Sequence, residues 1–316
     1  MKRLDPFMLA IVTALLVGSA VPLDGQAAVW MDRIVAAGIF WVFFLYGIKI
    51  APKEAGRALA NWRLHSLVLA STYVLFPLLG LLTTLIPHAV LPDDLALGVL
   101  FLCLLPSTVQ SSVTFTSIAQ GNVAGAMSAA SLSNLAGVFI TPLLAAALMG
   151  GTLTLSADLV LKVAAQLLLP FVLGQIARPF LADAVKRHPR AITLSDRSAI
   201  TLAVFAAASH AREAGVWSAV SALDLLVLFA VMIALLAAVL TLTWLVGRET
   251  RLPRGDRVVL VMCGSKKSLA SGIPMATVLL PASGIGMVVL PLILFHQLQL
   301  LTCATIARRW QPPPSM

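Results

Sequence analysis

The chain has 316 residues, of which 59% are hydrophobic and 11% are charged, and its mean hydropathy is +0.97. Soluble domains contain about 25% charged residues, so this composition excludes an ordinary soluble domain and predicts a polytopic helical membrane protein. The apolar runs are about 20 residues long, which excludes the ~10-residue alternating strands of a membrane β-barrel. The formal net charge of +9 indicates basic cytoplasmic loops and not nucleic-acid binding, because no basic stretch is interleaved with aromatic residues.

The apolar runs predict an all-α protein of ten transmembrane helices. The first run follows Lys2 and Arg3 and resembles a signal peptide, but we expect it to be retained because the repeat described below needs it. The predicted spans are Pro6–Val21, Val35–Ile50, Leu64–Leu85, Leu95–Ile118, Ala124–Met149, Leu159–Ile176, Ala199–Ala214, Leu223–Val246, Val258–Leu280 and Ile285–Ile306.

Lysine and arginine gather in the two tails and in the predicted loops after the second, sixth and eighth spans, which places both termini in the cytoplasm. Ten spans divide into five plus five, and two halves with an odd number of spans insert with opposite orientation. The sequence therefore predicts an inverted repeat, with residues 1–150 as the first half and 151–310 as the second. The tail 311–316 contains three consecutive prolines and is expected to be disordered.

Two polar, helix-breaking stretches interrupt the fourth and ninth predicted spans. The first is Leu105–Ser112, which contains Pro106, and the second is Val261–Gly272, which contains Gly264 and two adjacent lysines. A charged side chain at the bilayer centre costs roughly 2.5–3.5 kcal/mol on insertion scales, so it is a functional candidate that faces a protein interior or a cavity. Paired interruptions in corresponding spans of two halves indicate a transporter binding site.

These stretches, with Gly121–Val123, Ser131–Leu135, Thr141-Pro142 and Phe295–Gln297, resemble the bile acid:sodium symporter superfamily. The resemblance covers nearly the whole chain. It is strongest to the divergent bacterial branch of SBF-like symporters, which is similar to vertebrate solute carrier family 10 member 7. It implies a bacterial inner-membrane protein with a core domain (helices three to five and eight to ten) and a panel domain (helices one, two, six and seven). Helices four and nine would be broken and would cross in the core, substrate would bind between the domains, and the core would move against the panel.

The same resemblance implies a departure from sodium coupling. In sodium-coupled members helix nine carries a Glu, then a Gly, then Gln-Asn near two sodium ions. With Gly264 as the anchor, the Gln-Asn pair corresponds to Lys266-Lys267, and the Glu falls near Met262. One anionic ligand is thus absent and two cations are added, and a neighbouring ammonium repels sodium.

We hypothesise that an ammonium from Lys266 or Lys267 takes the place of a sodium ion and pairs with hydroxyls and carbonyls of the polar stretches. A lysine that exchanges its proton could couple transport to protons, and a charged one could attract an anion directly. The alternative is that one lysine is a structural tie to backbone carbonyls. The candidate substrate- or ion-binding residues are Ser107, Thr108, Gln110, Ser111, Ser112, Ser133, Asn134, Ser265, Lys266, Lys267, Ser268 and His296, with Pro106 and Gly264 as helix breaks.

The sequence favours a secondary transporter of a small organic anion in the lipid bilayer. No nucleotide-binding G-x-x-x-x-G-K-[ST] motif is present, so the energy would come from a proton or sodium gradient, and the sequence does not choose between them. The alternative is a non-pumping membrane regulator or binding protein linked to calcium homeostasis. An enzyme is not expected, because neither G-x-S-x-G nor paired intramembrane aspartates occur. No cofactor or metal is predicted, because the three cysteines form no CxxC or Cys/His cluster. The sequence does not indicate an oligomeric state.

Overall fold

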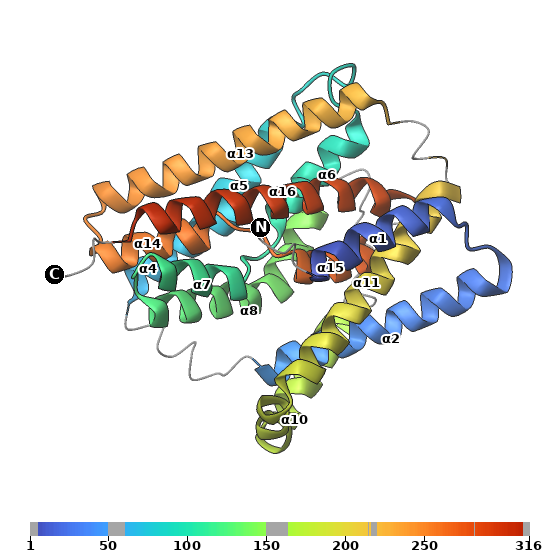
Figure 1. The fold of residues 1–316 in the computed structure, drawn as a ribbon, viewed down its shortest axis with the longest axis horizontal. Helices are drawn as coiled ribbons and strands as arrows, with labels where there is room; N and C mark the ends of the chain where they lie inside the picture. The colour runs from blue at the N-terminus through green and yellow to red at the C-terminus, as the bar shows by residue number, and fades with distance from the viewer. Residues whose placement is uncertain are drawn as a thin grey trace. The chain divides into compact units, whose positions relative to one another are not determined.

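The computed structural model describes residues 6–49, 61–149, 164–213, 215, 220–280 and 282–311. All regular secondary structure in these ranges is helical (Figure 1). Seven helical stretches are long and apolar enough to cross a membrane, and a shorter apolar helix, Leu9–Ala20, precedes them. The seven stretches are Gly25–Lys49, Trp62–Thr83, Val123–Leu148, Ala165–Arg187, Pro189–Glu213, Ala222–Glu249 and Val288–Arg309. The chain is therefore an integral membrane protein of the all-α class, whereas ten spans and an inverted repeat stay predictions.

The helices follow the predicted apolar runs closely at most ends. Their bounds are α1 Pro6–Ala20, α2 Gly25–Lys49, α4 Trp62–Ala70, η1 (a π-helix) Ser71–Leu75, α5 Phe76–Thr83, α6 Asp93–Leu104, α7 Gln110–Ile118, α8 Val123–Leu148, η2 (a π-helix) Ala164–Leu168, α10 Leu169–Arg187, α11 Pro189–Glu213, α13 Ala222–Glu249, α14 Arg254–Gly264, α15 Leu269–Leu279 and α16 Ala282–Arg309.

Two boundary predictions are wrong by a wide margin. The loop predicted after the sixth span is helical, because α10 runs to Arg187 and α11 begins at Pro189. Likewise, α2 begins at Gly25, ten residues before the predicted Val35. The predicted spans cover only the apolar runs, whereas the helices continue through neighbouring polar and charged residues, because lysine, arginine and alanine are good helix formers. The predicted disordered tail lies outside the described residues except for Gln311, and so do the predicted loop residues Lys53 and Arg57.

The chain divides into two compact units, each of which takes helices from both halves of the sequence. Unit 1 comprises Met1–Ile50, Gly150–Ser221 and Ile273–Val289. Its α2 packs against α10, and its α1 packs against α11. The α2–α10 contact depends on glycine, because a Cβ added to Gly47 would lie 2.2 Å from the Phe171 carbonyl oxygen, and one added to Gly174 would lie 2.1 Å from that of Phe44. Lys49 of α2 and Asp196 of α11 form an ion pair in this unit.

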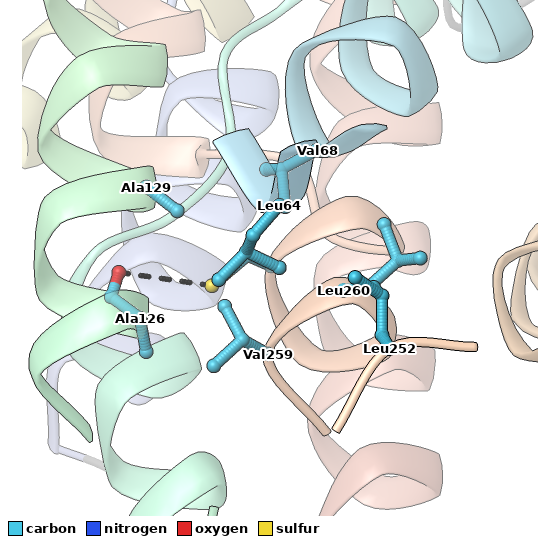
Figure 2. Packing of buried hydrophobic residues seen from close by; sticks show 8 residues of the cluster. Leu64, Val68, Ala126, Ala129, Leu252, Val259 and Leu260 are labelled. Carbon is cyan, nitrogen blue, oxygen red and sulfur yellow. Dashed lines mark hydrogen bonds between the residues drawn. The ribbon is translucent and has the colours of Figure 1, made fainter. Parts of the chain in front are cut away.

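Unit 2 comprises Ala51–Met149, Ala222–Gly272 and Leu290–Met316. One of its apolar clusters joins α4, α8, α14 and the turn before α14 (Figure 2). The residues in this cluster are Leu64, Val68, Ala126, Ala129, Leu252, Val259, Leu260 and Cys263. The Cys263 thiol donates a 3.7 Å hydrogen bond to the Ala126 carbonyl within it, drawn as the dashed line in Figure 2. This packing fixes the helix that leads into the lysine pair.

Candidate functional site

The helix of the fourth predicted span is interrupted between α6, which ends at Leu104, and α7, which begins at Gln110. Leu105 is extended, with φ −74° and ψ 156°, as expected for a residue that precedes proline. The break frees carbonyl groups, and each one from residue 103 to residue 107 accepts a hydrogen bond from another element. Four donor atoms make these five hydrogen bonds, at 2.7–2.9 Å. In chain order of the acceptors they are Lys267 Nζ, Thr141 Oγ1, Lys267 Nζ again, the Ser268 N–H and Asn134 Nδ2.

The second interruption lies between α14, which ends at Gly264, and α15, which begins at Leu269. Carbonyl groups of the last turn of α14 accept side-chain hydroxyls: Ser112 Oγ binds Met262 O at 3.0 Å, Ser107 Oγ binds Cys263 O at 2.6 Å, and Ser71 Oγ binds Gly264 O at 2.8 Å. Two of these three serines belong to the first polar stretch. The two interruptions are therefore joined to each other inside unit 2, mainly through backbone carbonyls.

A third irregular turn, the π-helix η1, adds one more free carbonyl. The Phe76 N–H bonds to the Ser71 carbonyl, so the Thr72 carbonyl lacks the partner that an α-helix would give it. The next residue is Pro77, which has no N–H to offer in the π register. The Thr72 carbonyl oxygen is thus available to a donor from outside its own helix.

Lys267 fills the space between these three irregular turns. Its Nζ donates to the carbonyl oxygens of Thr72 at 2.9 Å, Cys103 at 2.7 Å and Leu105 at 2.7 Å. The same atom lies 4.1 Å from the centroid of the Phe76 ring, within cation–π range. A lysine ammonium has three donors, and all three are used. The side chain is fully buried, so its charge is stabilised by carbonyl dipoles and an aromatic face.

Lys266 is also fully buried but lies in a different environment. Its Nζ is 4.0 Å from the centroid of the Phe115 ring on α7. No hydrogen-bond acceptor for this Nζ is found within the described ranges. The buried thiols of Cys303 and Cys263 lie near this amine. Because an ammonium buried without acceptors is costly, the two adjacent lysines are energetically unlike.

A polar network continues from Lys267 on two sides. Gln299 Oε1 accepts from the Lys267 N–H at 2.8 Å, and Gln299 Nε2 donates to the Lys267 carbonyl and to His296 Nδ1, each at 2.9 Å. Asn134 Oδ1 accepts from Ser271 Oγ at 3.0 Å, and the Ser268 hydroxyl accepts from the Ser271 N–H at 3.2 Å. These side chains fix the unwound segment, so the position of the ammonium is rigidly specified.

Most of the predicted site residues do come together in unit 2, but their roles differ from the expectation. The hydroxyls of Ser107, Ser112 and Ser268 do not bind an ammonium, and the acceptors of Lys267 are three backbone carbonyls, two of them outside the predicted stretches. The reason is that the hydroxyls satisfy α14 carbonyls and cap α15. Ser133 Oγ accepts from the Ser107 N–H at 3.0 Å, and Ser265 Oγ bonds back to Val261 O at 2.6 Å.

Five predicted residues are not joined to this network by side-chain hydrogen bonds within the described part of the chain. Gln110 is exposed, Thr108 is half-buried, and the buried Ser111 hydroxyl and Lys266 Nζ have no partner there. The Ser265 hydroxyl contacts the Val261 carbonyl and Cys303 Sγ, which are outside the network. The residues that sequence reasoning missed are Ser71, Thr72, Phe76 and Ser271. A hydroxyl pair within an apolar run, followed by Pro77, was the available signal for the first two.

Comparison with known proteins identifies the family. A model of the SBF-like CPA transporter family matches residues 5–312. The chain belongs to this family. It is 42% identical over 315 residues to "Putative symporter YfeH" of Escherichia coli (strain K12), which covers 98% of this chain and 94% of that protein. It is 23% identical over 309 residues to "Sodium/bile acid cotransporter 7" of Rattus norvegicus, which covers 95% of this chain and 90% of that protein.

Membership of the SBF-like CPA transporter family confirms the resemblance that the sequence motifs indicated. The family and the apolar helices together make the chain an integral membrane transporter. Lys267 lies in the second interruption, between α14 and α15, and the three acceptors of its ammonium are backbone carbonyl oxygens.

Proposed function

We propose that the protein is a secondary active symporter of a small organic anion, in which the Lys267 ammonium takes the place of one coupling sodium ion and a proton or sodium gradient still drives transport. The observation that carries the proposal is the set of three carbonyl acceptors around Lys267 Nζ. Oxygen cages built from backbone carbonyls bind dehydrated monovalent cations in other membrane proteins. A tethered ammonium in such a cage supplies the positive charge that a dissociable ion would supply.

We assign the substrate contact to the polar residues around this cage, with Ser107, Ser112, Ser133, Asn134, Ser268 and His296 as the nearest candidates. Lys266, which lacks an acceptor among the described residues, would meet the anion or exchange a proton when the site opens. The names of the relatives support a symporter, since one is called a symporter and another a sodium/bile acid cotransporter.

The proposed mechanism is alternating access by ten spans, in which α6/α7 and α14/α15 form the fourth and ninth. The division into two units supports it: α1, α2, α10 and α11 belong to unit 1, whereas α4–α8, α13 and α14 belong to unit 2. This division resembles the panel and core of the superfamily, except that Ile273–Val289, which includes most of α15 and the start of α16, belongs to unit 1. The alternative of a calcium-linked regulator has no supporting observation, since no cluster of metal-ligating side chains occurs in the described ranges.

The test is uptake of a panel of labelled carboxylates and sulfonates by proteoliposomes, with sodium or proton gradients imposed in turn. We expect wild-type uptake of at least one anion to persist when choline replaces sodium. Lys267→Ala removes the ammonium and leaves three carbonyl acceptors, so its uptake should fail in choline and return in part with sodium or lithium. Lys266→Gln is the comparison variant: its uptake should also fall if Lys266 meets the anion or exchanges a proton, but the acceptors of Lys267 stay occupied, so sodium or lithium should not restore it.

Sodium-driven uptake in the wild type that survives unchanged in both variants would show that the lysines are structural ties and that the cation binds elsewhere. The same assay identifies the driving gradient, because a proton-coupled carrier accumulates the anion when the outside is acidic, whatever the sodium concentration. Folding of each variant is checked by size-exclusion chromatography before reconstitution.

A further inference from the structure

A cavity in unit 2 lies away from the lysine site, at the end of the unit where α13 ends, α14 begins and α16 ends (Figure 1). Its volume is about 210 Å³, and it is lined by Trp244, Arg254, Arg257, Val258 and Trp310. Two arginines and two tryptophans around one small cavity make it both cationic and apolar. The transport mechanism proposed above uses none of these five residues.

Arg254 builds the wall of this cavity. Its guanidinium donates to the carbonyl oxygens of Gln120 and Ala119, each at 3.4 Å, and to that of Trp310. These acceptors are at the C-terminal ends of α7 and α16, where helix carbonyls lack partners of their own. Arg254 is therefore held in place, and it fixes three helix ends around the cavity.

Arg257 is the residue that lacks a partner. Its Nε atom is buried and has no hydrogen-bond acceptor among the described residues. Asp256, the adjacent acid, accepts from the amides of Asn61 at 2.8 Å and Asn122 at 2.7 Å and is thus already engaged. A buried guanidinium nitrogen without an acceptor is unfavourable, so the site would gain from an added anion.

The surroundings add an excess of positive charge. None of the arginines at this end is in an ion pair with a described carboxylate, and Glu249, the other acid of the turn, is exposed. These arginines are Arg248, Arg251, Arg254, Arg257, Arg308 and Arg309. The charges of such a cluster attract anions over about 8–10 Å at physiological ionic strength.

The apolar part of the cavity continues onto the surface of α13. Trp244 is 43% exposed, and Leu242, Leu245 and Val246 beside it are 36–39% exposed. The Arg248 guanidinium lies 5.9 Å from the Trp244 ring centroid. Tryptophan and arginine at the end of a membrane helix are typical of the interface, where a headgroup meets its acyl chains. A free phosphate would use the arginines but not this apolar surface.

We propose that this cavity binds the phosphate group of an anionic phospholipid, with Arg257 as the principal ligand and the acyl chains along the exposed face of α13. Arg254 positions the cavity, and the two indoles contact the glycerol region. Because α14 begins here and leads directly to the lysine pair, the lipid would hold the base of the helix that carries the transport site.

The test uses the full chain in nanodiscs or detergent, titrated with phosphatidylglycerol, phosphatidylcholine, and soluble glycerol phosphate, with binding read by native mass spectrometry. Phosphatidylglycerol should bind about tenfold more tightly than phosphatidylcholine, a difference typical of one charge-assisted site. Arg257→Gln should remove most of this preference. Arg251→Gln removes the same charge from an exposed residue of the same turn and should change binding less than about twofold.

Arg257→Lys keeps the charge but not the planar fork, so it should retain only part of the preference, and it provides a second variant if the glutamine variant does not fold. Equal losses for Arg251→Gln and Arg257→Gln would indicate diffuse attraction and no site. An unchanged preference in Arg257→Gln would also overturn the proposal. Competition by glycerol phosphate as strong as that by the lipid would replace the lipid with a soluble phosphate ester.

Discussion

At the scale of single residues, we expect the same substitution to change the stability of the protein differently at the two adjacent lysines. Lys267→Met removes the donor of three buried carbonyls, each of which then loses a hydrogen bond at a cost of about 1 kcal/mol or more. Lys266→Met replaces an amine that has no acceptor among the described residues with an apolar chain of similar length. Such a replacement is neutral or stabilising.

The measurement is thermal unfolding of the purified variants in detergent. We expect the midpoint of Lys267→Met to fall by several degrees, since about 3 kcal/mol is lost, and that of Lys266→Met to stay within a degree or two of the wild type or to rise. If Lys266→Met is destabilised as much as Lys267→Met, then Lys266 has an acceptor in solution and the distinction between the two lysines is wrong.

At the scale of elements, the sequence indicates where the helices break, but it does not indicate which donors bind the carbonyl groups that the breaks leave free. Pro106 and the Gly264–Lys267 run predict both interruptions from backbone preferences alone. The acceptors of Lys267 are backbone carbonyls, which every residue carries, so residue types give no signal for them. The Thr72 carbonyl can accept from Lys267 because the π-helix and the proline that follows it leave this carbonyl without a partner in its own helix. Hydroxyls and carbonyls of the polar stretches were expected to bind the ammonium. The Leu105 carbonyl does bind it, whereas the Ser107 and Ser112 hydroxyls donate to carbonyls of α14.

The π-helix makes a prediction of its own. Pro77→Ala restores an N–H that can bond to the Thr72 or Tyr73 carbonyl, and regular helix then competes with Lys267 for its acceptor. We expect anion uptake to fall severalfold while the protein still folds. Pro170→Ala is the matched control, because Pro170 follows the π-helix η2 in the same way but belongs to unit 1. Equal effects of the two substitutions would show that the proline acts on helix stability and not on the ammonium.

At the scale of the whole molecule, the distribution of basic residues and the positions of the helix ends in unit 2 indicate the same membrane topology. The start of α14, directly after the α13–α14 turn, is bonded to the link between α7 and α8, because the Asn122 N–H donates to the Gly255 carbonyl at 3.2 Å. These two connections therefore lie at the same end, as a ten-span topology requires for the links that follow the fourth and eighth spans. The link between α5 and α6 follows the third span and has no lysine or arginine from His88 to Asp94. It should face the opposite side of the membrane.

Labelling of single introduced cysteines tests this orientation. The native Cys103, Cys263 and Cys303 are buried, so a membrane-impermeant maleimide should leave them unmodified. We expect His88→Cys, at an exposed position of the α5–α6 link, to react in intact spheroplasts, and Arg251→Cys, in the α13–α14 turn, to react only in inverted vesicles. Reaction of both from one side would contradict the ten-span topology and the opposite orientation of the two halves. Reaction with the two sides exchanged would keep the topology but place the arginine-rich turns outside, against the charge rule on which the prediction rests.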